Sequence, residues 1–543
     1  MRGLGFVLCV VLLNCGVGSS AAAQDTGTER GGRRGRGAEA SAAPAAEQPA
    51  AGAKDEKAKA DKKDEKSDEP VTTQHQVTIS GEAITYDATA GYLVLPSYEG
   101  KPKANVFYIA YTRTGDGVEP AKRPVTYCFN GGPGSSSVWL HMGAIGPRRV
   151  PMTDGEGRPD EPAVPRPPYR VVENEHSWLD LSDLVFIDPV GTGYSRPVEG
   201  ESARQFQGIE EDIQAVGDFI RLYTTKHERW ASAKFLSGES YGTTRAAGLA
   251  SYLQETHGMF LNGIVFISTV HNFQTVRFDD GNDTPYWLYL PTYTATAWYH
   301  RRLAPELQGD LQGTLREAEA FASGEYLLAL AKGDALTDGE RAAVAAKLSR
   351  YTGLSVRFCT LANLRINNSV FCKELLRDQN PPRTVGRLDS RYTGIDATGI
   401  GSGAEYDPSY SAIQGPYTAA FNQYVRADLK YENDLWYEIL TGRVQPWNYD
   451  SAENRYANVA SRLRSAMHRN RDLFVHFASG YYDFATPYYA SDYTVTHLGL
   501  DPAVSGNVTR SYYESGHMMY IRMPDLAKLK ADVAAFYAKA LAR

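Results

Sequence analysis

The pentapeptide at 238–242, which reads Gly-Glu-Ser-Tyr-Gly, constrains this 543-residue chain more than any other segment. It has the G-x-S-x-G form, in which a serine stands on a sharp turn between a strand and a helix. The flanking residues suit that context: 233–237 is short and partly apolar, and 243–253 carries Ala and Leu at helical spacing. We therefore predict that Ser240 is a nucleophile. Glycine and serine also form ordinary turns, so the prediction depends on finding its partners.

A serine hydroxyl becomes a good nucleophile when a base takes its proton and a carboxylate orients that base. In folds with this turn, both partners follow the serine in the chain. Residues 472–478 predict a strand that leads to a turn at Asp483, and 511–518 predict another strand that ends in Gly-His. We predict Asp483 as the orienting carboxylate and His517 as the base.

Three other residues compete for these two roles. His141 and Asp188 precede Ser240, which is the wrong order, and His476 lies inside an apolar strand. Asp188 follows a predicted strand, and we expect it to hold the Gly-Thr-Gly turn at 191–193.

Acyl transfer also needs hydrogen-bond donors aimed at the oxygen that becomes negative. The backbone N–H of Tyr241, next to the nucleophile, is one candidate. A second is expected from the loop at 130–134, Asn-Gly-Gly-Pro-Gly, which follows a predicted strand at 125–129. Its glycines let the backbone approach a ligand closely. An ordinary Gly-Pro turn explains the glycines but not the asparagine that opens the loop.

Together these motifs resemble those of the serine carboxypeptidase family, peptidase family S10. The shared motifs are N-G-G-P-G, P-V-G-x-G-Y-S, G-E-S-Y-G, a G-x-x-D turn and a terminal G-H-M, in the same order, and the resemblance spans about 80–540. It implies an α/β-hydrolase fold with a central mixed, mostly parallel sheet. It also implies that the N–H groups of Gly132 and Tyr241 hold the oxyanion.

The resemblance further implies that Asn130, Gly131 and Glu239 bind the C-terminal carboxylate of a peptide substrate. An amide N–H and a protonated carboxyl both donate to a carboxylate, whereas an ionised Glu239 would repel it, so acidic conditions should favour hydrolysis. Two positions depart from the family pattern: Cys128 stands where the family has tryptophan, and Ala144 where it has a second glutamate. The carboxyl partner that raises the pKa of this glutamate in the family is therefore missing.

The first 23 residues have the features of a cleavable export signal: a basic start, an apolar stretch at 5–13 and Ala-Ala-Ala before Gln24. The apolar stretch is too short to span a bilayer. Leu-Leu-Asn-Cys at 12–15 resembles a lipoprotein cleavage box except for its asparagine. We predict an exported protein, periplasmic or extracellular, with lipid anchoring as the alternative. Residues 24–74 have almost no aromatic or branched apolar side chains, which predicts a disordered tail.

The charge, the motifs and the cysteine content limit which ligands, cofactors and disulfides we expect for this chain. The formal net charge is −7, and acidic residues interleave with the basic clusters of the tail, which argues against nucleic-acid binding. Neither H-E-x-x-H nor a paired C-x-x-C occurs, so no metal or other cofactor is implied. Cys128 is expected to be buried in its strand. Cys359 and Cys372 are close enough in sequence to form a disulfide in an oxidising compartment.

Residues 75–270 are predicted to form the first part of the hydrolase core, with antiparallel strands and then alternating strands and helices, including an amphipathic helix at about 205–226. Residues 461–543 complete the core. The interval 271–460 is too long for one crossover and contains helical stretches, which predicts a largely helical cap. Its aromatic run at 284–293 is expected to line the substrate pocket or to fill the core of the cap.

Three functions remain open from the sequence. The first is an exported serine carboxypeptidase that hydrolyses the C-terminal bond of peptides through an acyl-enzyme on Ser240. The second is an esterase or acyltransferase with the same triad, which the departures at Cys128 and Ala144 favour and the retained Asn130 and Glu239 oppose. The third is a binding protein with an inactive triad. The sequence leaves the oligomeric state open.

Overall fold

The computed structural model describes residues 69–152, 162–449 and 452–542. The predicted export signal and most of the predicted tail lie outside these ranges. The first strand, β1, begins at Val71, so the last residues of the range predicted as a tail belong to a sheet. Within the described ranges no helix combines the length and the apolar character needed to cross a bilayer.

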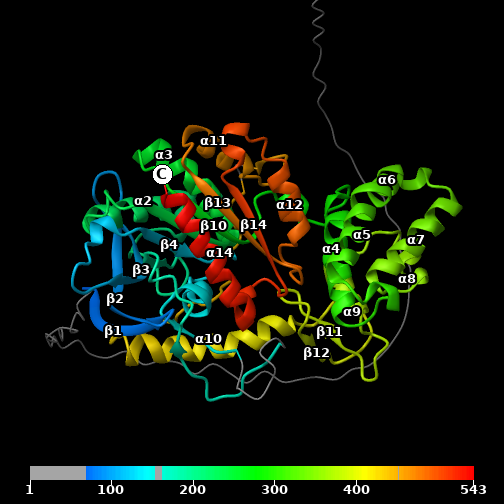
Figure 1. The fold of residues 1–543 in the computed structure, drawn as a ribbon, viewed down its shortest axis with the longest axis horizontal. Coiled ribbons are helices and arrows are strands. Elements are labelled where there is room, and N and C mark those ends of the chain that lie inside the picture. The colour runs from blue at the N-terminus through cyan, green and yellow to red at the C-terminus, as the bar shows by residue number, and fades with distance from the viewer. Residues whose placement is uncertain (1–68, 153–161, 450–451, 543) are drawn as a thin grey trace, which may run out of the picture. The chain divides into compact units, whose positions relative to one another are not determined.

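A ten-stranded sheet forms the centre of the molecule (Figure 1). In spatial order its strands are β1 (Val71–Ile79), β2 (Glu82–Pro96), β3 (Pro102–Arg113), β7 (Asp183–Ile187), β4 (Val125–Phe129), β9 (Lys234–Ser240), β10 (Gly263–Thr269), β13 (Phe474–Gly480) and β14 (Val508–Tyr513), and the short β8 (Arg196–Pro197) pairs with β3.

The sheet is mixed, as predicted. β1, β2, β3 and β7 pair antiparallel, whereas the pairs from β7 through β4, β9, β10 and β13 to β14 are parallel. Every residue of β4, β7, β10 and β13 is buried, because helices cover both faces of the parallel part. This topology confirms the predicted α/β-hydrolase architecture.

Alternate residues of each central strand enter two separate hydrophobic clusters. Tyr127 packs on one face of the sheet with α2 (Ile209–Lys226), α3 (Tyr241–His257) and α11 (Ala460–Arg469). Cys128 packs on the other face with α10 (Pro408–Ala427) and α14 (Met523–Leu541). The predicted helix at about 205–226 is α2, which begins after a one-turn helix at Ala203–Phe206.

The interval predicted as a cap divides into two parts. Its first part forms helices around a hydrophobic cluster of their own: α4 (Thr284–Tyr299), α5 (Leu311–Phe321), α6 (Leu327–Lys332), α7 (Asp338–Thr352), α8 (Val356–Leu361) and α9 (Asn368–Glu374). Its second part contains α10, whose Tyr417, Phe421 and Tyr424 belong to the core cluster beneath the sheet. Only the first part is therefore a cap with its own interior.

Several short elements complete the described chain. They are α1 (Val138–Leu140), α12 (Tyr488–Thr496), α13 (Pro502–Ser505), the strand pairs β5 (Arg148–Arg149) with β6 (Val172–Glu173) and β11 (Thr384–Val385) with β12 (Thr393–Gly394), a five-residue π-helical turn at His141–Ile145, another at Ala322–Tyr326, and 3₁₀ turns at Pro120–Lys122, Phe273–Thr275, Pro305–Leu307, Gly333–Ala335 and Met519–Ile521.

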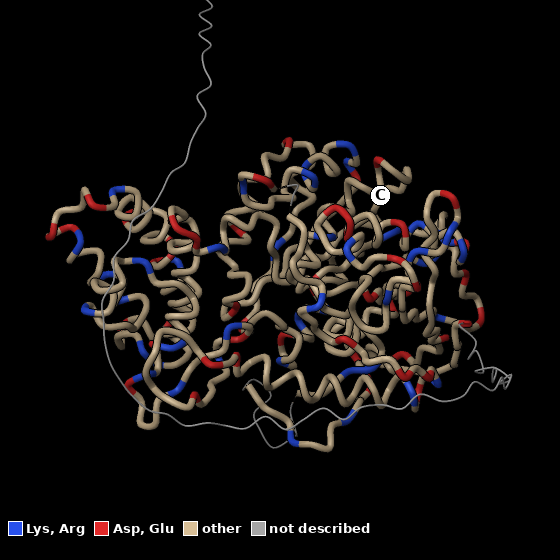
Figure 2. The backbone as a smooth tube through the Cα atoms, turned by 180° about the vertical axis from the view of Figure 1, so that it is seen from behind, with Lys and Arg blue, Asp and Glu red and all other residues tan. Residues whose placement is uncertain are grey.

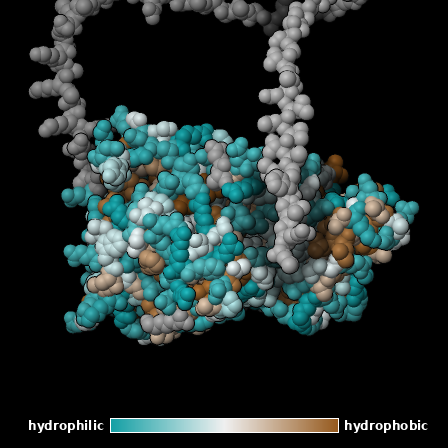
Figure 3. Space-filling model, turned by 90° about the horizontal axis from the view of Figure 1, so that it is seen from above, coloured by the Kyte–Doolittle hydropathy of each residue, from teal (hydrophilic) through white to brown (hydrophobic). Residues whose placement is uncertain are grey.

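The surface is polar and mixed in charge. Basic and acidic residues are both scattered along the backbone of the core and of the cap (Figure 2). Seen from above, the molecule is mostly hydrophilic, with brown areas on the lobe that carries the cap helices (Figure 3). Exposed apolar side chains of the cap include Leu328 and Leu361.

Candidate active site

Ser240, the predicted nucleophile, is the last residue of β9, and α3 begins at the next residue. Its φ of 60° and ψ of −130° are rare for a residue with a side chain, and such a conformation costs about 1–3 kcal/mol. A strained strand-to-helix turn of this kind exposes the side chain at the top of the sheet. Ser240 is accordingly the one residue of β9 that is only partly buried, and it lines a cavity.

His517 and Asp483 meet beside this turn although they are 34 residues apart. The distance from His517 Nδ1 to Asp483 Oδ2 is 2.8 Å, and Asp483 is fully buried. Burial lowers the pKa of His517, but the Asp483 carboxylate outweighs it, so the net pKa lies above the usual value. An imidazole that donates from Nδ1 to a carboxylate keeps Nε2 as an acceptor, and His517 lines the same cavity as Ser240.

The Asp483 carboxylate is held by the residues that follow it. Its Oδ1 accepts hydrogen bonds from the backbone N–H groups of Ala485, at 2.7 Å, and Thr486, at 3.0 Å. The Thr486 hydroxyl donates to Oδ2 at 2.7 Å. These three bonds fix the carboxylate where it contacts His517. Sequence reasoning missed Thr486; the available signal was the tendency of Asp to bond to the backbone two residues on, which is the contact seen with Ala485.

The competing residues have structural partners elsewhere. His141 contacts the Tyr111 hydroxyl at 2.6 Å, and burial lowers its pKa to about 3. His476 contacts the Thr509 hydroxyl at 2.8 Å. Asp188 accepts from the backbone N–H of Ser137 at 2.9 Å, so it ties the end of β7 to the loop that follows β4. None of the three lines the cavity of Ser240.

The glycine loop after β4 lies directly against the turn of Ser240. A Cβ on Gly131 would stand 2.4 Å from the backbone nitrogen of Tyr241, so only glycine fits there. Gly132, with φ of +103°, lines the cavity together with Tyr241. The N–H of Tyr241 belongs to the first turn of α3, where backbone donors have no acceptor inside the helix.

A buried arginine of α3 fixes this loop. Arg245 is 1% exposed, and its Nη1 donates to the carbonyl oxygen of Asn130 at 2.6 Å. Its Nε donates to Asp212 of α2 at 2.8 Å. The loop, α3 and α2 are therefore joined through one guanidinium group. No motif in the sequence pointed to this residue.

Asn130 and Glu239 form a buried polar pair that lines the cavity. The distance from Asn130 Nδ2 to Glu239 Oε1 is 3.0 Å, and Asn130 Oδ1 accepts from the N–H of Leu140 at 3.0 Å. The Tyr520 hydroxyl donates to Glu239 Oε2 at 2.6 Å. Burial raises the pKa of Glu239 to about 7, against the effect of these donors. A carboxyl with this pKa is protonated in mildly acidic solution.

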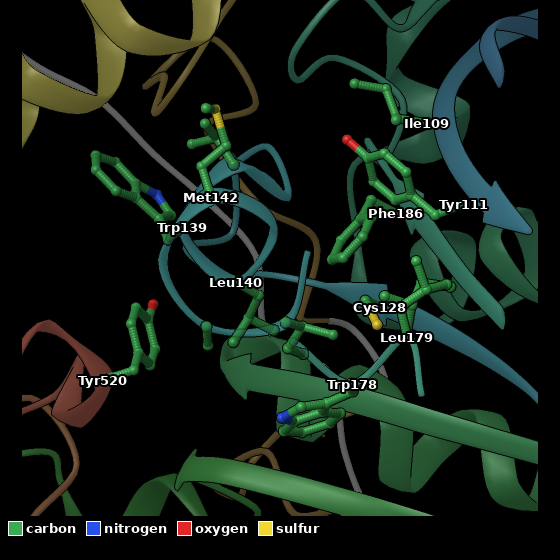
Figure 4. Close-up of a cluster of buried hydrophobic side chains, with 14 of the residues drawn as sticks. Ile109, Tyr111, Cys128, Trp139, Leu140, Met142, Trp178, Leu179, Phe186 and Tyr520 are labelled. Atoms are coloured by element: carbon green, nitrogen blue, oxygen red, sulfur yellow. The ribbon is translucent and has the colours of Figure 1, made fainter. Parts of the chain in front are cut away.

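As expected from Ala144, no second carboxyl of the described residues contacts Glu239, and the Tyr520 hydroxyl is the partner of its Oε2. Ala144 is buried and apolar, and no carboxyl group lies at that position. Figure 4 shows Tyr520 in the buried cluster that also contains Trp139, Leu140 and Cys128. Because burial, with a smaller contribution from the charge of Asp483, raises the pKa of Glu239, the missing glutamate does not remove the shift.

The cavity has a volume of about 410 Å³ and joins core and cap. The core supplies Ser240, His517 and the glycine loop, and α10 supplies Tyr410 and Ile413. From the aromatic run predicted at 284–293, Tyr289 lines the cavity, whereas most of its other apolar members fill the cap. One residue of this run therefore lines the cavity, as the first alternative predicted, and most of the others fill the core of the cap, as the second predicted.

The three cysteines of the described chain are free and buried. Cys128 lies in β4, as expected, and Cys359 and Cys372 are separate thiols rather than a disulfide. Burial raises the pKa of Cys359 to about 11 and also raises the pKa of Cys372. None of them lines the cavity of Ser240.

Comparison with known proteins agrees with this geometry. The family model for serine carboxypeptidases matches residues 80–520, most of the chain. The chain belongs to the serine carboxypeptidase family. Serine carboxypeptidase-like 46 of Arabidopsis thaliana is 28% identical over 200 residues, which are 35% of this chain and 38% of that protein. The pheromone-processing carboxypeptidase KEX1 of Yarrowia lipolytica is 29% identical over 147 residues, 26% of this chain and 21% of that protein.

The match thus spans well under half the length of these members of the serine carboxypeptidase family. Among solved structures, the prohormone-processing carboxypeptidase KEX1(delta)P of Saccharomyces cerevisiae has a TM-score of 0.48 and 16% identity. That comparison covers 83% of this chain and 91% of the other.

Proposed function

We propose that this protein is an exported serine carboxypeptidase that removes the C-terminal residue of peptides. The observation that carries the proposal is the hydrogen bond between His517 and Asp483 beside the same cavity that Ser240 and Glu239 line. A nucleophile, a base with an orienting carboxylate and a protonated acid in one cavity suit a substrate that ends in a free carboxylate. The predicted signal at 1–23 supports export.

The reaction follows from these groups. Ser240 Oγ attacks the carbonyl carbon of the last peptide bond while its proton passes to His517 Nε2, and the N–H groups of Gly132 and Tyr241 receive the negative oxygen. When the C–N bond breaks, His517 returns that proton to the leaving amino group. The acyl group remains on Ser240 until water, deprotonated by His517, releases it. Asp483 orients the imidazole throughout.

The carboxylate of the leaving residue is bound by Asn130, Gly131 and protonated Glu239. One hydrogen of the Asn130 amide is engaged by Glu239, which leaves the second for the substrate. A neutral Glu239 donates its proton, whereas an ionised one would oppose binding. This is the feature that separates an exopeptidase from a general esterase with the same triad.

The test compares three substrates with one acyl group: an N-blocked dipeptide, its C-terminal amide and a simple ester. For each substrate, kcat/KM is divided by the uncatalysed rate, and we expect this ratio to be highest for the free acid. Ser240→Ala should abolish both hydrolysis and fluorophosphonate labelling, while the melting temperature stays unchanged. Equal preference for the free acid and the amide would instead indicate an esterase or acyltransferase. Failure of wild-type Ser240 to react with the probe would indicate an inactive triad.

A further inference from the structure

Two arginines line the cavity of Ser240 without taking part in the triad or the carboxylate site. Arg277 follows β10, and Arg387 lies between β11 and β12. Both side chains are exposed at the cavity wall. Among the described residues, no carboxylate lies within 4 Å of either guanidinium group.

The charge balance of the cavity is consequently positive. Among the described residues that line it, Glu239 is the one carboxyl, and burial raises the pKa of this group to about 7. Asp389, two residues after Arg387, is buried and paired with Arg391 at 2.6 Å. Asp407 accepts hydrogen bonds from the backbone N–H groups of Arg387 and Leu388. Nothing in the described lining therefore neutralises the two guanidinium groups, which favours a substrate that brings negative charge.

The two arginines come from other elements than the carboxylate site. Glu239 accepts a hydrogen bond from the Tyr520 hydroxyl. Burial raises the pKa of Tyr417 on α10, and the nearby charge of Glu239 raises it further. The ring centroids of Tyr417 and Trp139 are 5.0 Å apart, so α10 and Trp139 surround the position of the leaving residue.

The arginine side is built from the segment after β10 and from α4. The Arg277 guanidinium lies 5.8 Å from the ring centroid of Phe273. Burial raises the pKa of Tyr289, and Arg387 and Arg277 both oppose that rise, which places both charges near this phenol. A peptide whose C-terminal carboxylate is held at Asn130 and Glu239 would bring its acyl part, rather than its leaving residue, toward Arg277 and Arg387.

We propose that Arg277 and Arg387 select peptides with an acidic side chain on the acyl side of the scissile bond. The inference rests on the carboxypeptidase function proposed above and names its substrate class. A substrate glutamate or aspartate would form ion pairs with a guanidinium group in a partly enclosed cavity, where such pairs are stronger than on an open surface. Glutamine at the same position would have nearly the same shape without the charge.

The experiment uses four N-blocked dipeptides, Glu-Leu and Gln-Leu for the acyl side and Leu-Glu and Leu-Gln for the leaving side. At a pH of about 6, where the side chain of a substrate glutamate is ionised, we expect kcat/KM for Glu-Leu to exceed that for Gln-Leu roughly tenfold. High salt should reduce this ratio. The double variant Arg277→Gln/Arg387→Gln should bring this ratio close to one and still hydrolyse Gln-Leu.

Arg357→Gln, an exposed arginine of α8 outside the cavity, removes one positive charge as a matched control and should keep the wild-type ratio. The proposal is overturned if wild type does not distinguish Glu-Leu from Gln-Leu, if the double variant keeps the preference, or if only Leu-Glu is preferred. In those cases the peptides are still hydrolysed, and the carboxypeptidase function stands. If none of the four is hydrolysed, that function fails first and this inference with it.

Discussion

Replacing Tyr520 by phenylalanine removes the hydroxyl that donates to Glu239 Oε2 at 2.6 Å. A hydrogen bond to a charged group contributes about 1.5–3 kcal/mol, and one to a neutral group about 0.5–1.5 kcal/mol. The midpoints of these ranges differ by about 1.3 kcal/mol, so the hydroxyl stabilises the ionised carboxylate over the neutral acid by about one pKa unit. Burial already raises the pKa of Glu239 to about 7. Without Tyr520 the pKa should rise by about one further unit.

The assay is the pH dependence of kcat/KM for an N-blocked dipeptide with a free carboxylate. Activity should rise as His517 loses its proton and fall as Glu239 loses its own, because the ionised carboxyl repels the substrate. In Tyr520→Phe, Glu239 keeps its proton to a higher pH, so the falling limb should move upward by about one pH unit. A simple ester, which has no carboxylate to bind, should lack the falling limb in both proteins.

Tyr417→Phe provides a matched control. The Tyr417 hydroxyl is buried in the same cluster and has no hydrogen-bond partner among the described residues. Its removal should leave the falling limb where it is. The reasoning is refuted if Tyr520→Phe leaves the limb unchanged or moves it to lower pH, or if the ester shows the same limb.

The remaining predictions concern the loop after β4 and its anchor. Asn130→Ala should raise KM for free-acid peptides about tenfold, the effect of one hydrogen bond to a charged group; an equal rise with esters would contradict carboxylate binding. Gly131→Ala should lower kcat about a hundredfold, because a Cβ would stand 2.4 Å from the nitrogen of Tyr241; wild-type kcat would show that the loop can shift. Arg245→Met should reduce the free energy of unfolding, measured in urea, by about 3–5 kcal/mol, because Asp212 then stays buried without its partner. Adding Asp212→Leu should recover much of this loss. If the second substitution recovers nothing, the unpaired charge of Asp212 is not the cause.

Much of the fold could be predicted because its signals are local. The apolar runs at β4 and β10 are long enough to identify buried strands, and the stripe of α2 repeats at helical spacing. The glycine-serine motif carries its own turn geometry, which identified Ser240 and its place at the end of β9. Chain order then selected Asp483 and His517, whose side chains the folded chain brings to 2.8 Å.

Contacts between segments that are distant in the chain have no local signal in the sequence. Tyr520 and Glu239 are 281 residues apart, and Arg245 contacts Asn130 across 115 residues. Their roles depend on how loops and helices pack against the sheet, which no periodicity within one segment encodes. The sequence alone therefore determined the strands, the nucleophile turn and the order of the predicted triad. The tertiary structure decided what sets the pKa of Glu239 and which charges line the cavity, because burial and distance exist only once the chain has folded.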